Sequence, residues 1–285
     1  MQVGIDVGAT KIESVVLEKD GQEKHRSRIS CPKNYTQIIT AIRDIHKKLE
    51  EDFKQELPIG VCHPGVHSPQ TGLVKNVPNI SWLEKKPFQN DLRKALGKEV
   101  FCENDANCFA LSESIDGSAK HYNIVFGIIL GSGCGGGLVV NKKIVKGANN
   151  LAGEWGHNNL VFGNVENFLS GLSLSNRFNN KFKKKLKASE IFDLFRKNDE
   201  NANKIINEYK ENLSISLSSI INILDPDAIV FGGGVSNEIT FLDEIKEKIE
   251  KLIGEAKINT AFIKPMYGDA SGVRGAARLG RKVNY

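Results

Sequence analysis

Several segments of the sequence place glycine or carboxylate residues directly after apolar, β-branched runs. Asp6 ends the first such run, and the turn that follows carries Gly8, Thr10 and Lys11. Because glycine has no Cβ, the backbone N–H groups of such a turn can approach an anion closely. A carboxylate beside phosphates would repel them unless a divalent cation lay between, and Mg²⁺ is usually held by one carboxylate together with substrate phosphates. The segment therefore predicts a metal and nucleotide site in which Asp6 holds Mg²⁺ directly or through water.

Two further glycine turns follow apolar runs, at residues 124–130 and 228–231. These turns are formed by Gly131, Ser132, Gly133, Gly232, Gly233 and Gly234. Each one alone is more often a simple tight turn, but three in one chain predict a polyphosphate ligand. The middle turn fits the G-x-G-x-x-G pattern, yet the dinucleotide fingerprint must open a helix, and here another apolar run follows. It also lacks the Gly-Lys-Ser/Thr of a P-loop.

Two polar segments could supply the chemistry. Asp105 follows a strand in the tetrapeptide Asn104-Asp105-Ala106-Asn107. It could cap a helix, or it could act as a base that accepts the proton of a hydroxyl attacking phosphorus; the tetrapeptide leaves both open. Glu154 and His157 flank a glycine in a loop too polar for the core, and carboxylate and imidazole groups are those that recognise hydroxyls on the wall of a cleft.

These residues lie on a plan of strand, turn, strand and helix that occurs twice, beginning at residues 2–6 and at 124–130. Periodicity and turn residues predict the remaining elements. We expect strands at 12–18, 23–30, 57–62, 99–102, 138–140, 228–231 and 259–264, and helices at 35–52, 88–96, from 104, at 200–224, 237–253 and from 271. The repetition predicts two related α/β lobes with a central cleft between them.

The composition fits this interpretation. With 285 residues, 40% of them hydrophobic, and a net charge of +5, the chain has the composition of a two-lobed globular protein and no expected membrane span. Its start lacks a basic leader, so we expect a cytoplasmic location. Five cysteines without a C-x-x-C pair argue against a disulfide framework or a thiolate zinc site. The dense basic cluster at 181–187 has no aromatic residues or reader module that would indicate nucleic-acid binding, and a solvated helix face is the better interpretation.

Taken together, the motifs resemble those of the ROK sugar kinases in order and spacing over essentially the whole chain. The matching segments are Asp6-x-Gly8-x-Thr10-Lys11, residues 103–107, 131–137, 153–157, Asp225-Pro226, 232–234 and 268–277. The resemblance implies an actin-like ATPase (ribonuclease H-like) α/β fold whose two lobes close over ATP and a hexose. It implies an N-terminal lobe at 1–114, a C-terminal lobe at 115–270, and a last helix at about 271–285 that packs back on the first lobe.

The same resemblance implies roles for single residues. Asp105 would be the catalytic base. The residues that would contact the sugar are Gly65, Asn79, Asn104, Asp105, Glu154, His157 and Glu166. Those that would surround the phosphates are Gly8, Thr10, Lys11, Gly131, Ser132 and Gly133, with Gly232, Gly233 and Gly234 along the adenosine. ATP and Mg²⁺ would be the cofactors, and a homodimer the assembly.

One segment departs from the family pattern. Many members follow the Gly-His with C-x-C-G-x-x-G-C-x-E, whose three cysteines bind a structural zinc together with the histidine. Here residues 158–165 contain no cysteine, so we expect no structural zinc. Glu166 follows in a segment that resembles the one just after the missing cysteines, and we expect it to reach the sugar without the metal.

Within the family, Val74-Lys75-Asn76, Ser81-Trp82-Leu83 and the segment 104–113 are similar to the bacterial fructokinase (mannokinase) branch, and the N-acetylglucosamine kinase branch shares much of this. The resemblance therefore implies phosphorylation of the 6-hydroxyl of fructose. N-acetylglucosamine kinase, N-acetylmannosamine kinase and glucokinase are the alternatives. A sugar-responsive repressor would need a DNA-reading motif ahead of the first strand, and a non-catalytic sugar sensor would not need both Asp6 and Asp105.

Overall fold

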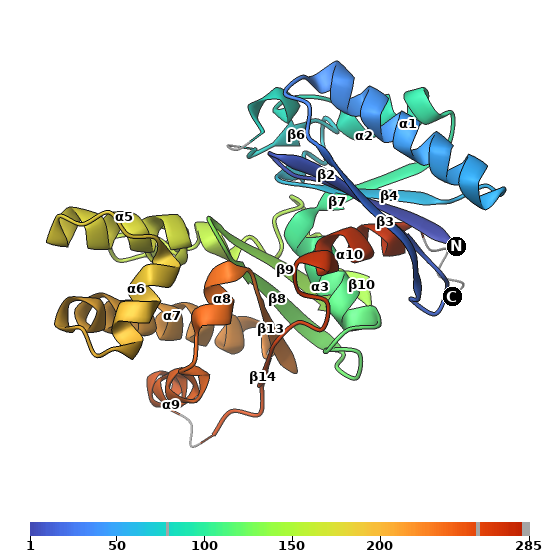
Figure 1. Cartoon of the computed structure of the whole chain (residues 1–285). Helices are drawn as coiled ribbons and strands as arrows, with labels where there is room; N and C mark the ends of the chain where they lie inside the picture. Colours follow the sequence, from blue (N-terminus) through green and yellow to red (C-terminus); the bar gives the residue numbers. More distant parts are fainter. Residues whose placement is uncertain (78–79, 255–256, 281–285) are drawn as a thin grey trace.

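Two five-stranded sheets form the centre of the computed structural model, which describes residues 1–77, 80–254 and 257–280 (Figure 1). The first sheet has the order β3-β2-β1-β4-β7 and the second β10-β9-β8-β13-β14. The first contains β1 (Gln2–Val7), β2 (Lys11–Leu17), β3 (Glu23–Ser30), β4 (Ile59–His63) and β7 (Val100–Asn104). The second contains β8 (Ile124–Leu130), β9 (Cys134–Val140), β10 (Lys143–Ile144), β13 (Ala228–Gly232) and β14 (Ala261–Ile263).

The two sheets share one topology, which confirms the α/β fold with a repeated plan. In the first sheet β1, β2 and β3 form an antiparallel meander, and β4 and β7 add to β1 as parallel strands. In the second sheet β8, β9 and β10 form the meander, and β13 and β14 are the parallel strands. The parallel strands of each sheet end at the same edge. The segments that follow β1, β4 and β7 therefore lie together, as do those that follow β8 and β13.

The helices cover the outer faces of the sheets and fill the space between them (Figure 1). They are α1 (Tyr35–Phe53), α2 (Phe88–Leu96), α3 (Asp105–Ile115), α4 (Glu166–Leu169), α5 (Gly171–Phe182), α6 (Ala188–Arg196), α7 (Glu200–Leu224), α8 (Gly234–Glu238), α9 (Leu242–Ile253) and α10 (Ser271–Leu279). Short elements complete the described chain: the pairs β5 (Val66–His67) with β6 (Val74–Lys75) and β11 (Asn159–Leu160) with β12 (Gly163–Asn164), and the 3₁₀ turns η1 (Ser81–Leu83), η2 (Trp155–His157) and η3 (Gly268–Ala270). None of the helices in the described ranges is long and apolar enough to span a bilayer.

Alternation along the strands explains the layers. Val125 of β8 packs in one apolar cluster with Phe109 of α3, whereas its neighbour Phe126 packs in another with Tyr209 of α7. In the first sheet Ile5 of β1 packs with Ile38 of α1. The two helices between the sheets are α3 and α10, which pack against each other. Helix α3 also contacts β8 and β9 of the second sheet, and α10 contacts β1 and β4 of the first. The two helices thus lie where the sheets meet, and the boundary between the lobes at residue 114 stays a prediction.

Two sequence-based boundaries are wrong. The strand after the glycine run was expected to begin at residue 138, but β9 begins at Cys134, so Gly136 and Gly137 lie inside it and pair with β8. A Cβ on Gly137 would lie 2.6 Å from the carbonyl oxygen of Ala106, so this glycine lets α3 approach the sheet, and Gly136 makes room for Trp155. The single helix expected at 237–253 is two helices, α8 and α9, because the chain between them turns Ile239 and Phe241 into the core.

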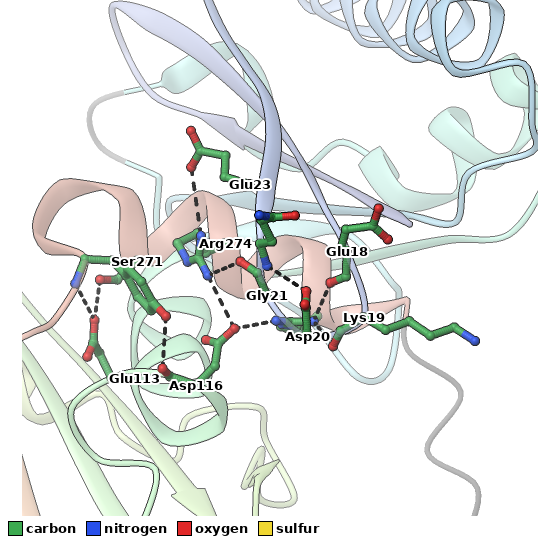
Figure 2. A network of polar contacts seen from close by, with 12 residues as sticks. Glu18, Lys19, Asp20, Gly21, Glu23, Glu113, Asp116, Ser271 and Arg274 are labelled. Carbon is green, nitrogen blue, oxygen red and sulfur yellow. Dashed lines mark hydrogen bonds and ion pairs between the residues drawn. The ribbon is translucent and has the colours of Figure 1, made fainter.

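A buried polar network joins α3 to α10 (Figure 2). The carboxylate of Glu113 accepts a hydrogen bond from the hydroxyl of Ser271, at 2.6 Å. Asp116, just after α3, pairs with Arg274 at 3.3 Å and with Arg278. Arg274 in turn donates to a backbone carbonyl in the turn between β2 and β3, at 2.8 Å. The network fixes the end of the helix that begins at Asp105 to the helix that packs on the first sheet.

Candidate active site

The carboxyl edge of the first sheet positions the candidate base. Asn104 is the last residue of β7 and the N-cap of α3, since its Oδ1 accepts hydrogen bonds from the N–H groups of Ala106 at 2.9 Å and Asn107 at 3.3 Å. Asp105 is therefore the first residue of the helix, and the helix cap is Asn104. Of the two interpretations of Asp105, capping is wrong. The Oδ1 of Asp105 accepts one hydrogen bond, from the N–H of Ala106 at 2.8 Å.

The surroundings of Asp105 suit a proton acceptor. Burial raises the pKa of its carboxyl to about 7, the negative charges of Asp6 and Glu154 raise that pKa as well, and the hydrogen bond from Ala106 lowers it. A general base is most effective when its pKa lies close to the working pH. The charges that act on Asp105 also show that the structure brings Asp6, Asp105 and Glu154 together, although they lie far apart in the sequence.

Asp6 is a buried carboxylate whose surroundings disfavour its negative charge in the absence of a cation. Burial raises the pKa of Asp6, a hydrogen bond from the thiol of Cys62 lowers it, and the charge of Glu13 raises it. In the ranges the structure describes, no group of three or more His, Cys, Asp or Glu residues could hold a metal ion. This donor set does not fit a cation caged by protein ligands alone. It fits Mg²⁺ held by one carboxylate and by phosphate oxygens.

The candidate sugar residues gather around Asp105. Asn104 donates from Nδ2 to the carbonyl oxygen of Gly65 at 3.2 Å, so the loop after β4 lies against the start of α3. Glu154 directly precedes the turn η2 and His157 is its last residue, with His157 Nε2 3.6 Å from Glu154 Oε2. The pKa of Glu154 is raised by burial and lowered by the charge of His157. The remaining candidate, Asn79, lies outside the described residues.

Glu166 lies between Glu154 and the glycine turn at 131–133. Its Oε2 accepts a hydrogen bond from the N–H of Cys134 at 2.9 Å, and a Cβ on Gly133 would come within 2.7 Å of the same oxygen. Its charge also acts on Glu154. The segment before it is the hairpin of β11 and β12, whose tip residues Val161 and Phe162 are 88% and 89% exposed.

The other two glycine turns meet at the carboxyl edge of the second sheet. Because Gly232 of β13 pairs with Ile129 of the parallel strand β8, the turns at 131–133 and 232–234 begin side by side. The N–H of Gly171, the first residue of α5, donates to the carbonyl oxygen of Gly131 at 2.7 Å. A Cβ on Gly131 or on Gly234 would meet no atom within 4 Å, so both turns border open space. This arrangement fits a phosphate chain.

The phosphate hairpin of the first sheet has the expected turn, with the N–H of Gly8 donating to the carbonyl oxygen of Lys11 at 2.9 Å. Thr10 is exposed at its tip. The amine of Lys11 lies 3.3 Å from the buried carboxylate of Glu13, which also binds Arg26 and Arg28. Lys11 therefore already has an anionic partner, and a bound nucleotide would share the positive charge of Lys11 with Glu13.

Sequence reasoning assigned no role to Glu103 or Lys146. Glu103 Oε1 accepts hydrogen bonds from the N–H of Asn104 at 2.9 Å and from Nδ2 of Asn107 at 3.1 Å, and Lys146 Nζ lies 2.8 Å from Glu103 Oε2. A carboxylate next to a candidate base in a buried strand is a signal that could have drawn attention to Glu103. Nothing in the sequence pairs it with a lysine 43 residues later (146 − 103 = 43).

Two α/β units of the same topology, with glycine turns at the sheet edges and a carboxylate at a helix start, define the actin-like ATPase architecture. The model of the ROK family matches residues 2–283, and the chain belongs to this family. The chain is 36% identical over 305 residues to an N-acetyl-D-glucosamine kinase of Haemophilus influenzae (strain 86-028NP), with 98% of this chain and 99% of that protein covered.

Solved structures agree with this fold. The ROK hexokinase from Thermus thermophilus superposes with a TM-score of 0.88 at 26% identity, covering 98% of this chain and 97% of that one. A ROK family glucokinase from Streptomyces griseus, solved with glucose and AMPPNP, superposes with a TM-score of 0.77 at 25% identity and 98% coverage of both chains. The predicted family and fold are confirmed. The expected place in the fructokinase branch is not supported, whereas the N-acetylglucosamine kinase alternative is.

Proposed function

We propose that this protein is an ATP-dependent sugar kinase that transfers the γ-phosphoryl group of ATP to the 6-hydroxyl of N-acetyl-D-glucosamine. The observation that carries the kinase assignment is the placement of Asp105, at a helix start beside Asp6 and Glu154, with a pKa of about 7. The full-length similarity to an N-acetyl-D-glucosamine kinase supports this sugar in place of fructose.

In this proposal the candidate residues have separate roles toward the sugar, the nucleotide and the metal. The carboxylate of Asp105 accepts the proton of the sugar hydroxyl as that oxygen attacks phosphorus. Glu154 accepts hydrogen bonds from the sugar and His157 donates or accepts them, so they orient the hydroxyl toward Asp105. The backbone N–H groups of the turns at 131–133 and 232–234 hold the nucleotide. Mg²⁺, held by Asp6 and phosphate oxygens when bound, would offset the negative charge of the γ-phosphoryl group.

A panel of N-acetylglucosamine, N-acetylmannosamine, fructose, mannose and glucose, each with ATP and Mg²⁺, tests the proposal through ADP release. We expect the highest kcat/KM for N-acetylglucosamine and much slower ADP release without sugar. A preference for fructose would refute the sugar assignment and leave the kinase. No sugar-dependent ADP release with any of them would refute the kinase itself. The homodimer implied by the resemblance, the cytoplasmic location and the absence of structural zinc stay predictions.

A further inference from the structure

An ion pair joins the two sheets on the sugar side of the candidate site. Lys146 follows β10 of the second sheet, and Glu103 lies in β7 of the first, yet Lys146 Nζ is 2.8 Å from Glu103 Oε2. The Glu103 side chain is 9% exposed and the Lys146 side chain 53% exposed. The carboxylate is thus nearly buried, and the ammonium reaches it from the solvent side.

The buried carboxylate of Glu103 is tied to the residues around the candidate base. Its Oε1 accepts from the N–H of Asn104 and from Nδ2 of Asn107, which flank Asp105 and Ala106 in the chain. Apart from the ion pair with Lys146, its Oε2 has no hydrogen-bond partner in the described ranges. The ammonium of Lys146 is therefore the group that offsets the charge of Glu103 at this oxygen.

Two nearby histidines do not replace Lys146 in that role. Burial, together with the neighbouring His67, lowers the pKa of His63 to about 4, and burial also lowers the pKa of His67. Both imidazoles are neutral at pH 7, with their Nε2 atoms 2.9 Å apart. Neutral rings cannot balance the carboxylate charge of Glu103.

The loop that carries Lys146 makes a second contact with the first lobe. Nδ2 of Asn150 donates to the carbonyl oxygen of His67 at 2.9 Å, and His67 follows the loop whose Gly65 carbonyl binds Asn104. The N–H of Ala152 donates to the carbonyl oxygen of Lys146 at 3.2 Å, which closes the loop on itself. The chain then continues directly into Gly153 and Glu154. The loop 145–152 thus links the Glu154 side of the site to the Asn104 side.

We propose that Lys146, through its ion pair with Glu103, is a positioning residue that sets Glu154 against Asn104 and Asp105 for sugar binding. This inference rests on the proposed function, because it concerns the same site. The turns at 131–133 and 232–234 that would hold the nucleotide belong to other loops of the second sheet. The effect should therefore fall on the sugar and leave the nucleotide largely untouched.

The test uses Lys146→Met, Lys146→Arg, Glu103→Gln and the double variant Glu103→Gln/Lys146→Met. Lys47→Met, on the exposed face of α1, is the matched control for losing a surface lysine paired with a carboxylate. For Lys146→Met we expect a KM for N-acetylglucosamine about tenfold higher and a KM for ATP within about twofold of wild type, since misplaced binding groups lose sugar affinity first. Lys146→Arg keeps the positive charge and should restore the wild-type sugar KM, and Lys47→Met should match wild type.

The double variant separates positioning through Glu103 from any other role of Lys146. Once Glu103→Gln has removed the charge, adding Lys146→Met should change the sugar KM by less than about twofold. An unchanged sugar KM in Lys146→Met, an equal rise in both KM values, or a full additional effect in the Glu103→Gln background would each overturn the proposal.

Hydrogen exchange of the ligand-free protein decides the question independently of activity. In Lys146→Met we expect faster amide exchange in residues 63–67 and 104–107 than in wild type, with α1 unchanged. Unchanged exchange in both segments would overturn the positioning role. If the wild-type protein phosphorylates no sugar of the panel, the proposed function fails, and this measurement still supports or refutes the ion pair as a link between the lobes.

Discussion

The pKa of Asp105 leads to a quantitative prediction about activity and pH. A base must be deprotonated to act, and a carboxyl with a pKa of about 7 is about one-eleventh deprotonated at pH 6 and about ten-elevenths at pH 8. The kcat/KM for the sugar should therefore rise about tenfold between pH 6 and pH 8 and then level off. A carboxyl with an ordinary pKa, near the model-compound value of 3.8, would give a flat profile over the same range.

Replacing Asp105 with Asn removes the proton acceptor while keeping the size of the side chain. Turnover should fall by about 10² to 10⁴, and the rise between pH 6 and pH 8 should disappear together with it. The assay is ADP release at subsaturating sugar and saturating ATP from about pH 5.5 to pH 9, which brackets the expected midpoint. A wild-type profile without a limb near pH 7, or a variant that keeps more than about one-tenth of wild-type turnover, would refute the assignment of the base.

The raised pKa of Asp105 also affects stability, and there the trend with pH is reversed: activity should rise with pH, whereas the free energy of unfolding should fall. The folded protein holds a proton on Asp105 up to about pH 7, whereas the unfolded chain loses it near pH 3.8, so this group destabilises the fold increasingly as pH rises from about 4 to 7. The full difference corresponds to an upper limit of about 4 kcal/mol, since each pKa unit is about 1.4 kcal/mol. Asp105→Asn should thus have a higher Tm than wild type at pH 8 and an equal Tm near pH 4. A Tm advantage that does not depend on pH would contradict the burial of this carboxyl.

Three further predictions concern packing, charge and metal. Gly137→Ala should lower the free energy of unfolding by about 1 to 3 kcal/mol, because its Cβ would lie 2.6 Å from the Ala106 carbonyl, and thermal unfolding would show it. Gly131→Ala, whose Cβ meets only open space, is the matched control and should leave Tm unchanged while raising the KM for ATP. Asp116→Asn should destabilise by about 3 kcal/mol, because it leaves buried Arg278 without its carboxylate and Arg274 with the more distant Glu23, at 3.9 Å, and an unchanged urea midpoint would show that the network contributes little. Chelation with EDTA should abolish ADP release and added Mg²⁺ should restore it, while metal analysis of the purified protein should find no stoichiometric zinc.

Local sequence patterns predicted the parts of the fold that depend on near neighbours. The meander from Gln2 to Ser30, the helix that begins at Tyr35 and the long helix that ends at Leu224 all appear close to their expected bounds. Each has turn or capping residues at its ends and a regular apolar period. The cap of α3 was not predicted: the sequence offered Asp105 as a possible cap, but Asn104 caps the helix and Asp105 is its first residue.

What depends on distant contacts could not be predicted from the pattern. Gly136 and Gly137 have the composition of a turn, but they pair with β8, and only the close approach of Trp155 to Gly136 and of α3 to Gly137 explains why these strand positions are glycine. The ion pair of Glu103 with Lys146 and the binding of Glu166 to the N–H of Cys134 join segments that meet only when the second sheet has formed. The sequence indicated which residues are candidates for the site. The charges that surround each of them depend on the assembled fold.

The assembled fold gathers more negative charge than it neutralises, and this explains how the site would use its ligands. Burial raises the pKa values of Asp6, Asp105 and Glu154 alike, and Asp6 and Glu154 raise that of Asp105 further. A fourth carboxylate, Glu103, lies beside them but is paired with Lys146. The lysine offsets only the carboxylate that has no proposed contact with substrate. The three without a lysine partner, of which Glu154 has His157 at 3.6 Å, are those to which the proposal assigns Mg²⁺, the reacting hydroxyl and the sugar, so ligand binding would relieve the repulsion among them.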